Sequence, residues 1–313
     1  MKLNHVRMKY FVMSLLTAAF VLWLVGSGQG AQVIIVLATL SAPLLLLLFG
    51  GMIVTYLLRA LRVYYEFGES TRGRFGACLK LVLTHNALVN LLPMRAGELS
   101  FPVLLKREFG VTIMRSGGSL LWLRAQDAII LATLSVVVWP GLAPAMRMAG
   151  VSLLIVGGVL LPHVAQRLLA KFSTGKLGDV CAALADSAHH ARTGWLWTIA
   201  NWSVKLMVLS QVFAQLLVVD WQVGAAGAVG GELAAISPVQ GVAGIGSYEA
   251  GAAAALVLSD VVWADGLKAA FSLHLLVLAS ALVCAGIALL VSTIFRNSLA
   301  SDDATTHKSS QEP

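Results

Sequence analysis

Arg95 and Glu98 are the residues of this sequence best placed to do chemistry, because both interrupt an apolar stretch at residues 86–98. Residues three apart meet on one face of a helical turn, so these two side chains could pair with each other. A charge inside a membrane costs about 2.5–3.5 kcal/mol, and two neighbouring charges therefore need a reason. We interpret Arg95 as a cation for a lipid phosphate, with Glu98 holding Arg95 or coupling a proton, and with Asn90 adding polarity. The alternative is a pair at the membrane surface that only anchors the segment.

Gly244 and Gly246 belong to a second interruption, at residues 236–249, which ends in Glu249. The glycine spacing resembles a phosphate-binding loop, but no strand is expected before it and no Lys-Ser/Thr pair follows, so we reject a nucleotide site. In a membrane the glycines would allow a tight turn whose backbone N–H groups face an anion. Glu249 is either the carboxylate of this site or the acidic cap of the helix that follows.

Three further charges, Arg124, Asp127 and Lys205, lie inside apolar segments, where ionisable residues are rare. The spacing of Arg124 and Asp127 predicts a mutual ion pair, whether its role is structural or functional. Lys205 is too deep in its segment to reach the surface, so we expect Glu249, Glu98 or a substrate phosphate as its partner. The candidate substrate-binding residues are Asn90, Arg95, Glu98, Arg124, Asp127, Lys205, Gly244, Gly246 and Glu249.

Motifs for catalysis or metal binding are absent from the sequence. There is no GxSxG or HExxH motif, and Cys78, Cys181 and Cys284 are too far apart for a metal site or a disulfide framework. His274 stands alone in an apolar segment, where packing with one hydrogen bond is the simplest explanation. We therefore expect no catalytic residues, no metal, no cofactor and no enzymatic activity.

The composition is that of a membrane protein. Of the 313 residues, 58% are hydrophobic and only 12% are charged, whereas soluble domains carry about 25% charged residues. The mean hydropathy is +0.84. The net charge of +7 does not indicate nucleic acid, because the basic residues lie mostly in short loops between apolar runs, where they report topology and contact with anionic lipid.

Continuous apolar runs predict an all-α fold, namely a polytopic helical membrane protein. A spanning helix needs about 20 apolar residues. We expect about six full spans, at residues 10–25, 33–58, 117–139, 148–164, 195–219 and 268–295. The two interrupted regions, residues 79–105 and 223–258, are each expected to form two half-helices that meet at a polar turn, as a re-entrant hairpin.

Basic residues set the orientation, because Lys and Arg accumulate in cytoplasmic loops. They place both termini in the cytoplasm and assign Arg59 and Arg62 to the cytoplasmic loop after the second span. The first hairpin then enters from the cytoplasm and the second from outside. The two halves, residues 10–139 and 148–295, therefore form an inverted repeat, a recurring plan of transporters whose binding sites lie at paired helix breaks.

The chain is expected to form one transmembrane domain over residues 1–296. Residues 177–188 have helical apolar spacing with charges elsewhere, which suits a helix on the membrane surface. The tail, residues 297–313, is rich in Ser, Thr and Asp without apolar periodicity and is expected to be disordered.

Three motifs carry a resemblance to a known family. Asn90-Leu-Leu-Pro-Met-Arg-Ala-Gly-Glu98 resembles the Asn…Pro-x-Arg-x-Gly-Glu motif of the lysylphosphatidylglycerol-synthase transmembrane-region family, the flippase domain of multiple-peptide-resistance proteins and their free-standing relatives. Arg124-Ala-Gln-Asp127 resembles the Arg-x-x-Asp motif of that family. Pro238 through Glu249 resembles its Pro…Gly-Gly-x-Gly-x-x-Glu motif, but Val242 and Ala243 stand where Pro and Gly are common.

The resemblance covers most of residues 10–295. It implies a lipid flippase of the bacterial inner membrane that moves an anionic or amphiphilic phospholipid between leaflets. Relatives are linked to aminoacylated phospholipids, hopanoids and glycolipid pathways, so the lipid is left open. The expected partners are membrane lipids, with a second copy of the chain or a separate lipid-synthesising enzyme as further candidates, and no nucleic acid.

Two alternatives remain. The chain is a membrane-embedded enzyme acting on a lipid-linked substrate if His, Asp or metal-binding side chains converge in a cavity. It is a non-transporting accessory subunit of envelope lipid biosynthesis if the two hairpins pack together with no cavity.

Overall fold

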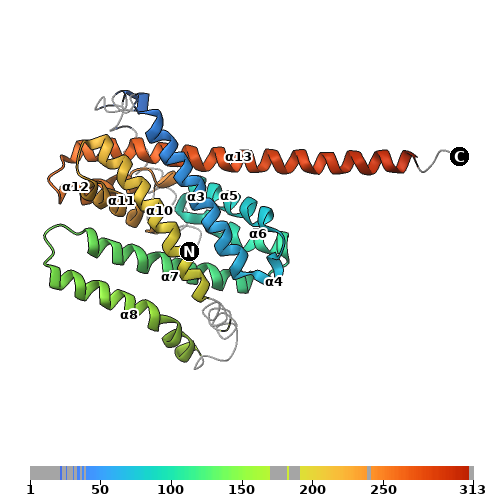
Figure 1. Ribbon diagram of the computed structural model, residues 1–313, viewed down its shortest axis with the longest axis horizontal. Helices are drawn as coiled ribbons and strands as arrows, with labels where there is room; N and C mark the ends of the chain where they lie inside the picture. The colour runs from blue at the N-terminus through green and yellow to red at the C-terminus, as the bar shows by residue number, and fades with distance from the viewer. Residues whose placement is uncertain are drawn as a thin grey trace, which may run out of the picture.

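The computed structural model describes residues 40–169, 191–237 and 241–309, with isolated positions before residue 40 and at residue 182. These ranges fold into helices joined by short turns and contain no strand, which confirms the predicted all-α fold (Figure 1). The elements are α3 (Ala42–Glu66), α4 (Gly68–Thr71), α5 (Phe75–Leu91), η1 (Pro93–Leu99), α6 (Ser100–Phe109), α7 (Ile113–Val138), α8 (Pro144–Leu169), α10 (Ala191–Leu217), α11 (Trp221–Ile236), η2 (Val242–Gly244), α12 (Ser247–Val257) and α13 (Trp263–Ser309).

Several of these helices can cross a membrane. In the described part of the chain, four are long and apolar enough, namely Ala42–Glu66, Ile113–Val138, Pro144–Leu161 and Trp263–Val291. The count rises to five if Gly194–Leu217 and Trp221–Ile236, which are bent by 117° at their junction, are taken together as one broken span. Five of the six predicted spans overlap these helices. All but one of the positions of the first predicted span, at residues 10–25, lie outside the described residues. The same holds for the predicted surface helix at residues 177–188.

The predicted bounds of the second span are wrong. Helix α3 begins at Ala42, with Pro43 in its first turn, and runs to Glu66 instead of ending near residue 58. Proline suits this start because the first N–H groups of a helix have no partner within it. The helix continues past residue 58, and its last turns carry Arg59 and Arg62, which line an internal cavity. They are therefore helix residues rather than loop residues.

The first interrupted region folds back on itself. Pro93 starts η1 directly after an extended residue, and η1 then packs against α5. A β-carbon on Gly97 would overlap the backbone carbonyl of Leu88, so only glycine permits this approach. Gly110, with φ of 71°, ends α6 in the left-handed conformation typical of a helix C-terminus.

The second interrupted region is a tighter antiparallel pair. On α11, Gly230 would place a β-carbon 2.5 Å from the Gly251 carbonyl of α12, and Gly231 would place one 2.7 Å from the Tyr248 ring. Small residues of this kind let two membrane helices approach closely. The turn between the helices uses left-handed backbone at Gly244 and Gly246, and also at Ala243.

The two breaks meet inside the protein. Elements η1 and η2 are in contact, which confirms the prediction that the two tips approach each other. One hydrophobic core joins both halves of the chain, with Leu48 of α3, Phe213 of α10, Leu256 of α12 and Leu273 of α13 among its buried members. The tips are therefore held between the spanning helices.

Two helices depart from this core (Figure 1). Helix α8 packs along α7, and only 6% of its apolar window is buried inside the protein. Helix α13 continues to Ser309, through most of the tail for which the sequence predicts disorder. Between Gly286 and Pro313 the chain has no glycine or proline that would break the helix.

Candidate functional site

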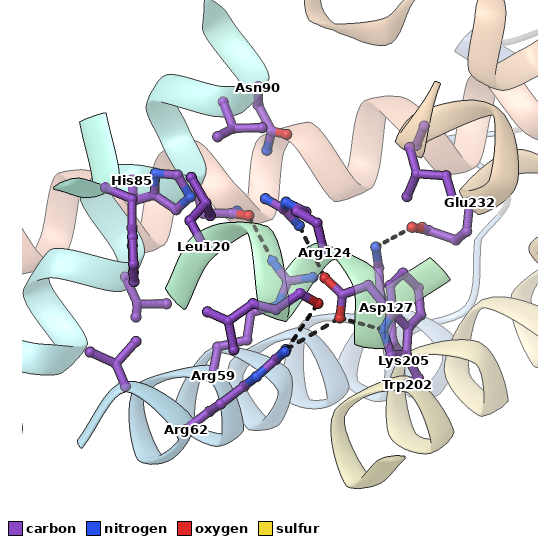
Figure 2. A pocket seen from close by; sticks show the side chains of 18 residues that line it. Arg59, Arg62, His85, Asn90, Leu120, Arg124, Asp127, Trp202, Lys205 and Glu232 are labelled. Atoms are coloured by element: carbon purple, nitrogen blue, oxygen red, sulfur yellow. Dashed lines mark hydrogen bonds and ion pairs between the residues drawn. The ribbon is translucent and has the colours of Figure 1, made fainter. Parts of the chain in front are cut away.

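A cavity of about 150 Å³ lies between α3, the first interrupted region, α7, α10 and α11 (Figure 2). Its walls include valines and leucines, but its most prominent groups are polar. The ionisable and amide residues that line it are Arg59, Arg62, His85, Asn86, Asn90, Arg124, Asp127, Lys205 and Glu232. Ionisable groups are costly at membrane depth, so their collection in one cavity is the main feature of the molecule.

Asp127 of α7 is the centre of the charged cluster. Its Oδ1 accepts hydrogen bonds from Arg62 Nη1 of α3 at 3.2 Å and from Trp202 Nε1 of α10 at 3.0 Å. Its Oδ2 pairs with Arg124 Nη1 at 3.1 Å, which confirms the predicted ion pair. A buried carboxylate is tolerated when it is paired and hydrogen-bonded. Asp127 meets that condition and joins three helices.

Arg62 has a second set of acceptors on α7. Its Nη2 donates to the Leu123 carbonyl at 3.1 Å and to Gln126 Oε1 at 2.8 Å. The same amide oxygen accepts a 3.3 Å hydrogen bond from Thr198 of α10. This guanidinium is therefore held by α7 from two sides.

Glu98 connects the first interrupted region to the cluster. Its Oε1 lies 3.1 Å from Arg124 Nε, and the two side chains are 22% and 30% exposed. The sequence analysis did not anticipate Arg124 as a partner of Glu98, and the suggested pairing of Glu98 with Arg95 stays a prediction. The backbone of Arg95 lies in η1, and its side chain is outside the described residues.

Lys205 pairs with a residue that the sequence analysis did not propose. Its Nζ lies 2.6 Å from Glu232 Oε2, so the expected partners Glu249 and Glu98 are wrong. The 117° bend between α10 and α11 turns α11 back beside α10, which brings Glu232 opposite Lys205. The ammonium also lies 5.2 Å from the centre of the Trp202 ring, within the range of a cation–π contact.

Arg59 differs from the other cations of the cavity. Its Nη1 donates to Asn86 Oδ1 at 3.0 Å and its Nε donates to Asn201 Oδ1 at 3.3 Å. Both acceptors are neutral amides, and no carboxylate of the described residues pairs with it. The sequence analysis missed Arg59 and Arg62 as site residues, although α3 buries polar Thr55 and Arg62 seven residues apart on its apolar face.

Glu249 lies in a separate cluster and does not line the cavity. It is fully buried, with Oε2 accepting the Gly246 N–H at 2.6 Å and Oε1 lying 2.7 Å from His274 Nδ1 of α13. This contact confirms the single hydrogen bond expected for His274. Because Gly246 donates to Glu249, this N–H is not the free anion donor that the glycine pattern suggested. Gly244 lies beside the His274 ring.

The predicted site residues therefore fall into two groups. Asn90, Arg124, Asp127 and Lys205 line the cavity, and Glu98 joins it through its ion pair. The glycines and the carboxylate of the second interruption form the other cluster. Over the described part of the chain, no three His, Cys, Asp or Glu residues are grouped so that they could hold a metal.

Comparison with known proteins gives one match. The family described as the lysylphosphatidylglycerol synthase TM region matches residues 11–286. Searches among curated proteins and among solved structures gave no match.

Proposed function

The chain belongs to the lysylphosphatidylglycerol synthase TM region family, and on this premise we propose that it moves an anionic or amphiphilic phospholipid between the leaflets of a bacterial inner membrane. The observation that carries the proposal is the charged cavity enclosed by apolar helices. A headgroup needs polar partners to enter the hydrocarbon layer, and intramembrane ionisable residues are a common mark of substrate pathways.

Among the described residues, four ion pairs hold charged side chains in and beside the cavity, and this supports a site that binds and releases a charged headgroup. Arg124 contacts both Glu98 and Asp127, and it is the most exposed member of these pairs. A phosphate entering beside Arg124 can replace Glu98 as its partner, because Arg124 keeps its pair with Asp127 and the partly exposed side chain of Glu98 can turn toward water. We propose that this exchange admits the headgroup while the acyl chains stay in the bilayer.

We further propose that both interrupted regions are re-entrant hairpins in an inverted repeat. The first enters from the cytoplasm, the second from outside, and both termini are cytoplasmic. Two features support this plan: the breaks contain Pro93 in one region and Gly244 and Gly246 in the other, and η1 lies in contact with η2. Paired breaks that meet near a binding site are typical of transporters.

A cavity-filling variant tests the proposal. Val89→Trp inserts a large ring at a residue that lines the cavity, whereas Val159→Trp makes the same change on the exposed surface of α8. The ring would occupy space that the headgroup needs, so we expect translocation to slow about tenfold in Val89→Trp alone, while overpacking lowers stability by about 1–3 kcal/mol. The assay follows dithionite quenching of fluorescent phospholipids in proteoliposomes, with protein incorporation matched. Equal rates for both variants, or no acceleration by the unmodified protein, would contradict transport through this cavity.

A further inference from the structure

The described cations and carboxylates of the cluster do not balance. Arg62 and Arg124 share Asp127, Arg124 also pairs with Glu98, and Lys205 pairs with Glu232. Four cations thus face three carboxylates. The excess positive charge is on Arg59, whose partners are two neutral amides.

The amides orient Arg59 without neutralising it. Asn86 of α5 and Asn201 of α10 accept from Nη1 and Nε, and these two bonds use two of the five N–H donors of a guanidinium. The remaining donors suit a planar two-point contact with a phosphate or carboxylate. Arg59 is only half-buried and lines the cavity, so a ligand there can reach it.

The preceding part of the chain holds no carboxylate that could neutralise Arg59. The first Asp or Glu in the sequence is Glu66, so residues 1–58 hold none whatever their arrangement. Glu66 shares the helix with Arg59, but its Oε1 accepts a 3.1 Å hydrogen bond from Ser119 on the far side of Arg62. No placement of residues 1–58 can therefore give Arg59 a carboxylate partner from that part of the chain.

We infer that Arg59 binds a single phosphate group bearing one negative charge, and that the cavity selects lipids with one net negative charge. This inference rests on the proposed function and names its substrate class. A lipid with a cationic headgroup would need a carboxylate for its amine, yet the described lining carboxylates Asp127 and Glu232 are each paired with a cation. Among the side chains that the structure describes, Arg59 is the lining cation without a carboxylate partner, and a phosphodiester with no amine matches its single charge.

Binding is tested with purified protein in detergent. Thermal unfolding is followed while phosphatidylglycerol, phosphatidylcholine or inorganic phosphate is added, because a ligand that binds the folded state raises its melting temperature. Phosphatidylglycerol should stabilise the protein and phosphatidylcholine should not. Arg59→Gln should weaken this binding about thirtyfold or more, since it removes one partner of a desolvated charge pair. Arg59→Lys should bind with intermediate affinity because it keeps the charge and loses the fork.

Arg72→Gln is the matched control, since Arg72 is exposed in the turn before α5 and the change removes the same charge. Its lipid response should equal that of the unmodified protein. A different result is that inorganic phosphate alone stabilises as strongly as phosphatidylglycerol, with both effects abolished by Arg59→Gln. That result would support an anion site at Arg59 and would overturn the choice of a lipid as its ligand. Equal stabilisation by phosphatidylglycerol and phosphatidylcholine, or an unchanged response in Arg59→Gln, would overturn the inference.

Translocation in proteoliposomes separates this inference from the proposed function. Arg59→Gln should lose the preference for fluorescent phosphatidylglycerol over fluorescent phosphatidylcholine. If the unmodified protein moves neither lipid but still binds phosphatidylglycerol through Arg59, transport fails while the binding site stands. If it moves lipid and Arg59→Gln keeps the same preference, transport stands while the role of Arg59 fails.

Discussion

The two interrupted regions contain similar residues, a proline or glycines followed by a carboxylate, but their carboxylates have different surroundings. Glu98 is 22% exposed and reaches a different helix, where it meets Arg124 beside the cavity. Glu249 is fully buried and bonds to the turn of its own region and to His274 of α13. The first carboxylate is placed where a ligand can compete for its partner, and the second is placed where it fixes a fold.

The helices of the two interrupted regions also differ in how closely they pack against each other. In the second region, Gly230 of α11 and Gly251 of α12 bring the two backbones together, and Gly227 and Gly231 of α11 make room for side chains of α12. In the first, one close approach at Gly97 holds η1 against α5, and α6 packs against α7 as well as against α5 and η1. We therefore expect the second region to act as a fixed frame and the first region to move when lipid enters.

The strongest test of this contrast removes the buried carboxylate. Glu249→Ala leaves His274 and the Gly246 N–H without their partner, and breaking a buried pair costs about 3–5 kcal/mol. We expect a large fall in the melting temperature of the detergent-purified protein. The control is Glu108→Ala, which breaks the exposed pair with Arg74 and should cost less than about 1 kcal/mol. Similar melting temperatures for the two variants would show that Glu249 does not stabilise the fold.

A second test addresses the single close approach in the first region. Gly97→Ala puts a methyl group on the Leu88 carbonyl, so η1 must shift, at a cost of about 1–3 kcal/mol. Gly76→Ala is the matched control, because no atom lies within 4 Å of its new β-carbon and alanine favours a helix by about 0.5–1 kcal/mol. The melting temperature should therefore fall in Gly97→Ala and rise slightly in Gly76→Ala.

A third test separates stability from transport. Glu98→Gln weakens a partly exposed ion pair, so the stability loss should stay below about 1 kcal/mol. Transport should change more than stability, because the Arg124 pair lies beside the cavity. Measuring translocation and melting temperature on the same preparation checks this. If Glu98→Gln unfolds at as low a temperature as Glu249→Ala, then Glu98, like Glu249, stabilises the fold.

The smallest expected effect concerns the turn of the second region. Ala243 has φ of 56°, a left-handed conformation that costs a residue with a β-carbon about 1–2 kcal/mol. Ala243→Gly relieves this strain but gives the unfolded chain more freedom, so the net gain should be about 1 kcal/mol or less. A small rise in melting temperature would confirm it. Glycine suits this turn because it adopts a positive φ without steric cost.

Local spacing in the sequence was enough to predict the pair of Arg124 with Asp127 and the two helix breaks, because each depends on neighbouring residues. The pair of Lys205 with Glu232 depends on a 117° bend, which no residue spacing specifies. Arg59 and Arg62 were assigned to a loop because basic residues after an apolar run usually mark its end. Their true role depends on which face of α3 is buried, and that is set by packing against α10 and α5.

The loose attachment of α8 has a kinetic consequence. The helix contributes little to the core, so detaching it from α7 breaks few buried contacts and has a small free energy of opening. The turn before it contains Gly141, with φ of 72°, followed closely by Pro144, the first residue of α8. A helix attached in this way can swing in microseconds to milliseconds while the remaining helices stay folded. We expect distances between spin labels on α8 and α10 to be distributed more broadly than distances between labels on α3 and α10, because α8 is the less buried helix.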